Sequence, residues 1–172
     1  MVGGGGAWRS PQPRVAELEH AFRDLGVRSV ICLRADSPGT GWYDREKAAC
    51  GRLGLNLKCF GWSAWSVSPA QIDELIGFLA ESPGAYLIHC RAGRDRTSLA
   101  AAIYRIVVLG HSKNAAASEL SFFPHGHLPW FGYGAMDEAL EDFDVEDGRR
   151  RYRSRRHEHQ LGGHRGSVVD GM

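Results

Sequence analysis

The sequence has little that would place the chain in a membrane, a secreted scaffold or a fibre. Its longest apolar stretch, residues 98–109, is interrupted by Arg105 and is too short to cross a bilayer. Residues 1–13 hold several glycines but no apolar leader core, so we expect no secretory signal. With 43% apolar and 24% charged residues, the composition excludes a wholly disordered or fibrous chain.

Cysteines are few, and no two of them are closely spaced. The four cysteines form no Cys-x-x-Cys pair and no dense framework, so we expect reduced thiols and a cytoplasmic location. Cys32 and Cys59 lie in apolar segments, where a packed core thiol is the simplest interpretation. The alternative is that one of them protects Cys90 by forming a reversible disulfide.

No metal-ligand pattern accompanies the histidines. Those that could suggest a metal site have no acidic or cysteine partner at ligand spacing. They are His125, His127, His157, His159 and His164. We therefore expect neither a metal nor an organic cofactor.

The net charge of +1 identifies no partner, but it hides a concentration of arginine near the C-terminus. We predict one folded domain over residues 1–147 and a basic, disordered tail over residues 148–172. Such a tail could attract nucleic acid or anionic lipid, yet a solvated end is simpler. No nucleic-acid recognition module is evident, and we expect a monomer without a nucleic-acid partner or a membrane span.

Apolar periodicity alternates between strands and helices along the chain. Helical spacing predicts helices over residues 15–25, 44–53, 71–80, 97–109, 113–122 and 134–143. Short apolar runs predict strands over residues 27–33, 55–60 and 85–89. Ser68 and Pro69 precede the third helix with capping-box spacing. The alternation predicts an α/β fold with a mostly parallel central sheet flanked by helices.

The most informative segment runs from His89 to Thr97, where a cysteine ends a strand and an arginine begins a helix. A loop that closes on a helix N-terminus points amide groups inward and forms an anion site suited to phosphate. Gly93 permits the tight turn. The positive electrostatic field of such a loop and helix N-terminus also lowers a cysteine pKa from about 8.5 to roughly 3.5–7.5. Cys90 would then be ionised at neutral pH. Arg96 can direct two N–H donors at a phosphoryl group, a geometry that lysine cannot reproduce.

The Cys-x5-Arg-Thr pattern resembles the signature of the protein tyrosine and dual-specificity phosphatases. The full run, His-Cys-Arg-Ala-Gly-Arg-Asp-Arg-Thr, is similar to the compact bacterial and fungal-plant type of dual-specificity-like phosphatase. Residues 8–13 resemble the Arg-Ser-x-x-Pro opening of that subfamily, and residues 30–34 resemble its first core strand. The resemblance covers residues 8–143 and implies that residues 1–147 form a phosphatase domain.

The resemblance implies a role for each residue of the segment. Cys90 would be the nucleophile and Arg96 the phosphate-binding arginine. Thr97 has the position whose hydroxyl helps the sulfur to leave, and His89 would brace the loop. Ser98 stands where many relatives have glycine, which the first turn of a helix should tolerate. The substrate cradle would be formed by Arg91, Ala92, Gly93 and Arg94 together with Thr97.

The general acid stays open between two aspartates. In the larger family an aspartate on a mobile loop protonates the leaving oxygen, but residues 60–66 contain no carboxylate. Asp95 is the first candidate, because a similar Asp-Arg-Thr ending places an acid there in myotubularin-like and some bacterial phosphatases. Asp36, in a loop after the strand at residues 27–33, is the second.

The expected activity is hydrolysis of phosphomonoesters through a cysteinyl-phosphate intermediate. Arg91 and Arg94 add positive charge beyond what catalysis requires, so phosphoinositides or inositol phosphates are expected substrates beside phosphorylated proteins. The alternative is a module of the same fold that binds phosphate with little turnover. The mid-chain position of Cys90 and the Arg-Thr ending disfavour an arsenate reductase or a sulfurtransferase.

Overall fold

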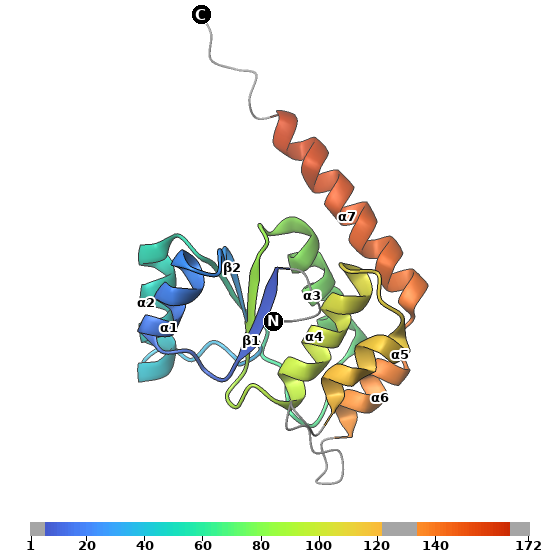
Figure 1. Ribbon diagram of the computed structural model, residues 1–172, viewed down its shortest axis with the longest axis horizontal. Coiled ribbons are helices and arrows are strands. Elements are labelled where there is room, and N and C mark those ends of the chain that lie inside the picture. The colour runs from blue at the N-terminus through green and yellow to red at the C-terminus, as the bar shows by residue number, and fades with distance from the viewer. Residues whose placement is uncertain (1–5, 122–133, 166–172) are drawn as a thin grey trace, which may run out of the picture.

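A sheet of four parallel strands forms the centre of the computed structural model, which describes residues 6–121 and 134–165 (Figure 1). The strands are β1 (Ala7–Ser10), β2 (Ser29–Cys32), β3 (Asn56–Cys59) and β4 (Tyr86–His89), in the order β1-β4-β2-β3. Helices α1 (Val15–Arg23) and α2 (Gly41–Leu53) cover one face of the sheet. Helices α3 (Pro69–Glu81) and α4 (Asp95–Val107) cover the other. The predicted α/β fold with a parallel sheet is confirmed.

Each helical layer buries its own apolar core against the sheet. Successive side chains of a strand point to opposite faces, so Val30 and Leu87 pack toward α1 and α2. Their neighbours Ile31 and Ile88 pack toward α3 and α4. Each fully buried aliphatic side chain contributes about 1.5–3 kcal/mol. Because β2 and β4 are buried on both faces, their sequences are continuous apolar runs, which explains why they were predictable.

Most of the predicted elements are present, with shifted ends. Helix α3 has the predicted cap, because the Ser68 hydroxyl accepts a hydrogen bond from the Gln71 amide at 3.3 Å. The helix predicted to start at Asp44 begins earlier, at Gly41, after the N-cap residue Thr40. The Asp44 carboxylate instead accepts a hydrogen bond from the Gly39 amide at 3.2 Å, so it fixes the turn before the helix.

Three elements differ from the prediction: one was not predicted, one is divided and one is shorter. Strand β1 was not predicted, because four residues at a sheet edge carry too short a pattern. The helix predicted over residues 113–122 is divided into α5 (Lys113–Ala116) and a 3-10 helix, η1 (Ala117–Leu120), and residue 122 lies outside the described residues. The helix predicted over residues 134–143 is the shorter α6 (Ala135–Glu141).

The structure corrects the expected disordered tail for residues 148–165, which belong to the long helix α7 (Val145–Arg165) (Figure 1). Arg151 and Arg155 each place a guanidinium nitrogen 2.7 Å from an Asp73 carboxylate oxygen on α3. Tyr152 packs against the core beneath α3 and α4. Low apolar content predicted disorder wrongly, because arginine head groups matched to acceptors on α3 hold this helix. The domain boundary near residue 147 stays a prediction.

The described helices are either too short or too polar to span a lipid bilayer. Helix α7 is the longest of them, but it is rich in arginine. Across residues 6–121 and 134–165, no helix combines the length and the apolar character needed to span a membrane.

We expect Asp73→Asn to loosen α7. Partial burial raises the pKa of Asp73, but hydrogen bonds and charge from Arg155 and Arg151 outweigh it and lower that pKa. A carboxyl with a lowered pKa stabilises the fold above its unfolded pKa of about 3.9, and this contribution is lost as the pH falls through the folded value. The substitution should cost about 1 kcal/mol at neutral pH and speed hydrogen exchange in α7, measured by mass spectrometry.

Glu74→Gln is the matched control for this prediction. Glu74 lies on the same helix but pairs with Lys58 at 2.9 Å rather than with α7. Equal exchange rates in α7 for both variants would show that Asp73 does not hold the helix.

Candidate active site

The carboxyl ends of the four parallel strands meet at one edge of the sheet, and the segments that follow them build the site. Strand β2 continues to α2 on one face, whereas its neighbour β4 continues to α4 on the other. In parallel sheets a ligand crevice forms where neighbouring strands connect to opposite faces. Cys90 follows β4 directly and therefore lies at this crevice.

The loop between β4 and α4 encloses the sulfur of Cys90, a residue that is only 3% exposed. The amides of Ala92 and Arg94 and the hydroxyl of Thr97 lie close enough to the sulfur to stabilise negative charge on it. Burial alone raises the pKa of Cys90. The Thr97 hydroxyl, the charge of Arg96 and the two amides together outweigh burial, so the pKa lies below its usual value. The loop therefore favours a thiolate at this position.

The guanidinium of Arg96 is held by the loops that follow the two neighbouring strands. Its Nη1 donates to the carbonyl oxygen of Trp62 at 3.0 Å and to that of Leu33 at 3.4 Å. Leu33 follows β2, and Trp62 lies in the segment after β3. One side chain thus links three strand ends, and its orientation is fixed before any ligand binds.

The loop packs closely on the segment that follows β1. Gly93 has a φ of +69°, and a Cβ built there would lie 2.6 Å from the Pro11 nitrogen and 2.7 Å from the Ser10 carbonyl carbon. The Gln12 amide also donates to the Arg91 carbonyl at 3.2 Å. Only glycine fits at position 93, for reasons of both backbone conformation and space.

Arg9 of β1 braces the same loop from below. Its Nη2 donates to the Gly93 carbonyl at 3.0 Å and to the Ser98 hydroxyl at 2.8 Å. Its Nη1 contacts Glu119 of η1 at 2.8 Å, and both side chains are nearly buried. Ser98 therefore supports the loop as an acceptor for Arg9. Arg9 was not predicted as a site residue, although residues 8–13 carried part of the resemblance.

His89 lies at the base of the loop in a buried polar chain. Its Nδ1 is 3.3 Å from the Cys90 carbonyl, and its Nε2 is 2.7 Å from Glu46 Oε1 on α2. Glu46 Oε2 accepts from the Gln12 side chain at 2.8 Å, and the Gln12 amide oxygen accepts from Arg34 at 2.8 Å. Glu46 and Gln12 were not predicted, because one acid on an amphipathic helix and one glutamine between prolines carry no motif.

The two candidate acids lie in different settings. Asp95 is the first residue of α4 and is partly buried within the Cys90 loop. Asp36 is exposed in the loop after β2, where a hydrogen bond from Tyr43 raises the pKa of that tyrosine. Asp36 also lines a pocket of about 510 Å³ together with Cys50 and Cys59. The structure brings Asp95, but not Asp36, into the loop itself.

The remaining loop side chains face outward. Arg91, Ala92 and Arg94 are exposed at the mouth of the loop. Burial lowers the pKa of Arg34, and the like charges of Arg91 and Arg96 lower it further. Several positive charges therefore gather at this edge of the sheet, which suits a ligand with more than one negative charge.

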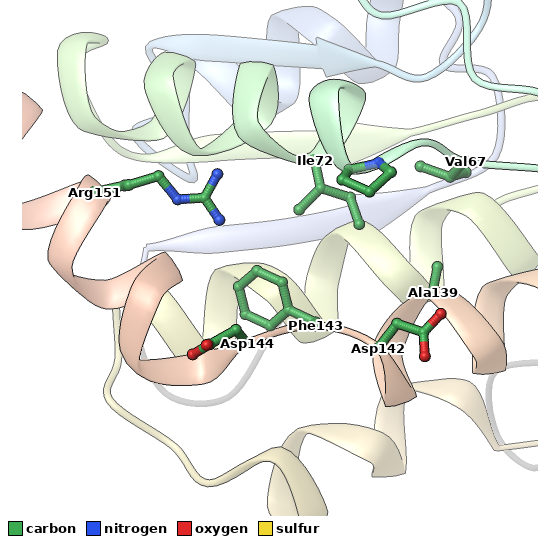
Figure 2. A pocket seen from close by; sticks show the side chains of 8 residues that line it. Val67, Ile72, Ala139, Asp142, Phe143, Asp144 and Arg151 are labelled. Carbon is green, nitrogen blue, oxygen red and sulfur yellow. The ribbon is translucent and has the colours of Figure 1, made fainter.

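A separate pocket of about 240 Å³ lies between α3, α6 and α7. Figure 2 shows Val67, Ile72 and Phe143 around it, with Arg151 reaching in from α7. Its lining shares no residue with the Cys90 loop. We assign it no part in the site.

The sequence matches a known phosphatase family and several curated proteins. Residues 9–139 match a family described as PTP-SAK, the DSP-PTPase phosphatase domain of a Swiss Army Knife protein. The chain is 35% identical over 136 residues to the dual specificity protein phosphatase TpbA of Pseudomonas aeruginosa, which covers 78% of this chain and 55% of that protein. A beta-lactamase hydrolase-like protein of Xylella fastidiosa is 31% identical over 134 residues, 77% of this chain and 29% of that protein. The chain thus spans about half or less of the length of these relatives.

Solved structures show the same architecture. The crystal structure of P. aeruginosa TpbA matches with a TM-score of 0.64 at 26% identity, covering 83% of both chains. The core catalytic domain of the PP-IP phosphatase SIW14 from S. cerevisiae, in complex with citrate, matches with a TM-score of 0.63 and covers 85% of both chains. Its identity of 18% supports a shared fold alone.

We expect Gly93→Ala to open the loop, because the added methyl group would meet backbone rather than a movable side chain. Inorganic phosphate binding, measured by calorimetry, should fall at least about tenfold, and the protein should lose roughly 1–3 kcal/mol of stability. Gly110→Ala is the matched control, because Gly110 has a φ of +73° with no atom within 4 Å of a built Cβ. Equal phosphate affinity in both variants would contradict the close packing of the loop.

Proposed function

This chain belongs to the PTP-SAK family of dual-specificity-type phosphatase domains, and we propose that it hydrolyses phosphomonoesters through a phosphorylated Cys90. The observation that carries the proposal is the ring of donors around one sulfur. Two loop amides, the Thr97 hydroxyl and the positive charge of Arg96 all stabilise negative charge on the Cys90 sulfur. Such a ring binds a phosphoryl group and stabilises the charge on its oxygens in the transition state.

The reaction would proceed in two displacements. The Cys90 thiolate attacks phosphorus, the bond to the leaving oxygen breaks, and a carboxylic acid gives that oxygen its proton. Water then attacks the phosphocysteine, its proton passes to the same carboxylate, and the sulfur–phosphorus bond breaks to release phosphate. Arg96 uses Nη1 for the two backbone carbonyls, so its other donors would hold the phosphoryl oxygens. The Thr97 hydroxyl would stabilise the departing sulfur.

The substrates proposed are phosphotyrosine, phosphoserine or phosphothreonine proteins and phosphoinositides or inositol phosphates. One solved relative is TpbA in complex with phosphotyrosine, and another is described as a PP-IP phosphatase. The exposed Arg91 and Arg94 support a substrate that carries further phosphates beyond the one cleaved. All four cysteines are free, which supports a reducing compartment such as the cytoplasm, and we propose a monomer.

A phosphate-binding module with little turnover is the second candidate. One observation favours it: residues 60–66 offer no carboxylate, and Asp36 is engaged by Tyr43. Without an acid, the loop would still bind phosphate but would protonate a poor leaving group slowly.

Phosphate release separates the two candidates. We expect the wild-type protein to release phosphate from at least one class in a panel of phosphopeptides, phosphoinositides and inositol phosphates, and Cys90→Ser to abolish release. Arg96→Lys should weaken binding and turnover together, because lysine cannot form a two-pronged contact. Cys50→Ser is the control, since this thiol is buried elsewhere on α2 and should leave turnover unchanged. Phosphate binding without release by the wild type would support the binding module.

Asp95→Asn and Asp36→Asn serve as controls for each other. If Asp95 is the acid, Asp95→Asn should slow turnover of poor leaving groups by about 10²-fold or more and hardly affect p-nitrophenyl phosphate. Asp36→Asn should then behave as the wild type on both substrates. The reverse pattern would assign the acid role to Asp36, and equal losses on good and poor leaving groups would exclude proton donation by the substituted residue.

A further inference from the structure

A second cluster of potential ligand atoms lies beneath the Cys90 loop. One donor atom each from Cys32, Glu46 and His89 lies within 4.8 Å of the others, and all three residues are buried. Cys32 ends β2, His89 ends β4, and Glu46 lies on α2. Three elements distant in sequence thus direct a thiol, a carboxylate and an imidazole toward one point.

Two atoms of this cluster face each other at short range. Glu46 Oε1 and His89 Nε2 are fully buried and 2.7 Å apart, and within the described residues neither has a further hydrogen-bond partner. A cation could take the place of a proton between them and accept a lone pair from each atom.

Cys59 is a fourth potential ligand, and the pocket beside it gives access to the buried ligand atoms. Cys59 is the parallel-sheet partner of Cys32, so the two side chains lie on the same face of the sheet. Cys59 is only partly buried and lines the pocket of about 510 Å³ beside Lys58 and Cys50. An ion could therefore reach the buried donors from solvent through this pocket.

The outer contacts of the cluster suit a metal-ligating histidine. His89 Nδ1 lies 3.3 Å from the Cys90 carbonyl, which can accept a proton on Nδ1 when an ion takes the lone pair of Nε2. Glu46 Oε2 accepts from the Gln12 side chain at 2.8 Å, so Oε1 is the oxygen available to an ion. Such partners orient metal ligands and are part of most well-defined sites.

We propose that Cys32, Cys59, Glu46 and His89 form a zinc site under the Cys90 loop. Two thiolates, an imidazole and a carboxylate are a tetrahedral ligand set that zinc takes. Both thiol protons pass to solvent when the ion binds. The Glu46–His89 separation widens slightly to admit bonds of about 2.0–2.2 Å. The site joins β2, β3 and α2 to the residue that precedes the nucleophile, and the proposed phosphatase chemistry does not require it.

The test uses the full chain with Cys90→Ser, because the Cys90 thiolate could itself bind zinc. Protein freed of metal by a chelator and kept reduced is dialysed against zinc, and the bound metal is counted. Cobalt then reports the ligands, because thiolate coordination gives a near-ultraviolet charge-transfer band. We expect one equivalent of zinc and a cobalt–thiolate band. Adding Cys32→Ser or Cys59→Ser should reduce the band by about half and weaken zinc binding at least about tenfold, and adding both should remove the band.

Two control variants separate this site from other sources of binding. Cys50→Ser removes a thiol of the same pocket that is not among the proposed ligands, and its affinity should be unchanged. His157→Gln with His159→Gln removes exposed histidines of α7, and it too should bind as before. His125 and His127 lie outside the described residues.

The outcomes decide the proposal. Cys59 is partly exposed, so Cys59→Ser keeps the test valid if the buried Cys32→Ser fails to fold by circular dichroism. The proposal is overturned by absence of saturable zinc binding, by binding that survives both thiol substitutions, or by binding that is lost with the α7 histidines.

Discussion

The contact of Gly93 with the backbone of Ser10 and Pro11 is the constraint on which the site depends. The Cys90 loop can direct its amides at one sulfur only if it turns sharply, and the turn must fit against the segment after β1. That segment then holds the loop through Arg9 and the Gln12 amide. The edge strand β1, short as it is, therefore acts as the support of the site, and its pairing with β4 sets the distance between support and loop.

The arginines of the site are neutralised to different degrees, and this decides which of them are available to a ligand. Arg9 is paired with the buried carboxylate of Glu119, so its charge serves the fold. Arg96 is anchored by the carbonyl oxygens of Leu33 and Trp62, which orient the side chain without cancelling its charge. An anion that enters the loop meets a cation that is fixed in place and still unneutralised. This is the condition under which electrostatic stabilisation of a transition state is effective, because no reorganisation is needed during the reaction.

The sequence was sufficient for the parts of the molecule whose signals are local. The apolar runs of β2 and β4, the Ser68 cap and the segment from His89 to Thr97 each carry their information within a few residues. The supports of the site were not predictable in this way. Arg9, Gln12 and Glu46 act through partners 22 to 110 positions away in sequence, and such pairings leave no periodicity. Helix α7 was missed for the same reason, since Asp73 lies 78 and 82 positions from its two arginines.

Counting arginines in the sequence overstates the positive surface of this protein. Arg149 pairs with Glu146 at 3.0 Å, and Arg150 pairs with Asp147 on the same helix. With Arg151 and Arg155 paired to Asp73, much of the positive charge of α7 is compensated by carboxylates. The exposed Arg91 and Arg94 lie instead at the mouth of the Cys90 loop. We therefore propose that selection among anionic substrates depends on these two side chains rather than on the arginine-rich C-terminal segment. Charge that is close to the bound phosphoryl group and uncompensated by a carboxylate acts most strongly on a polyanion.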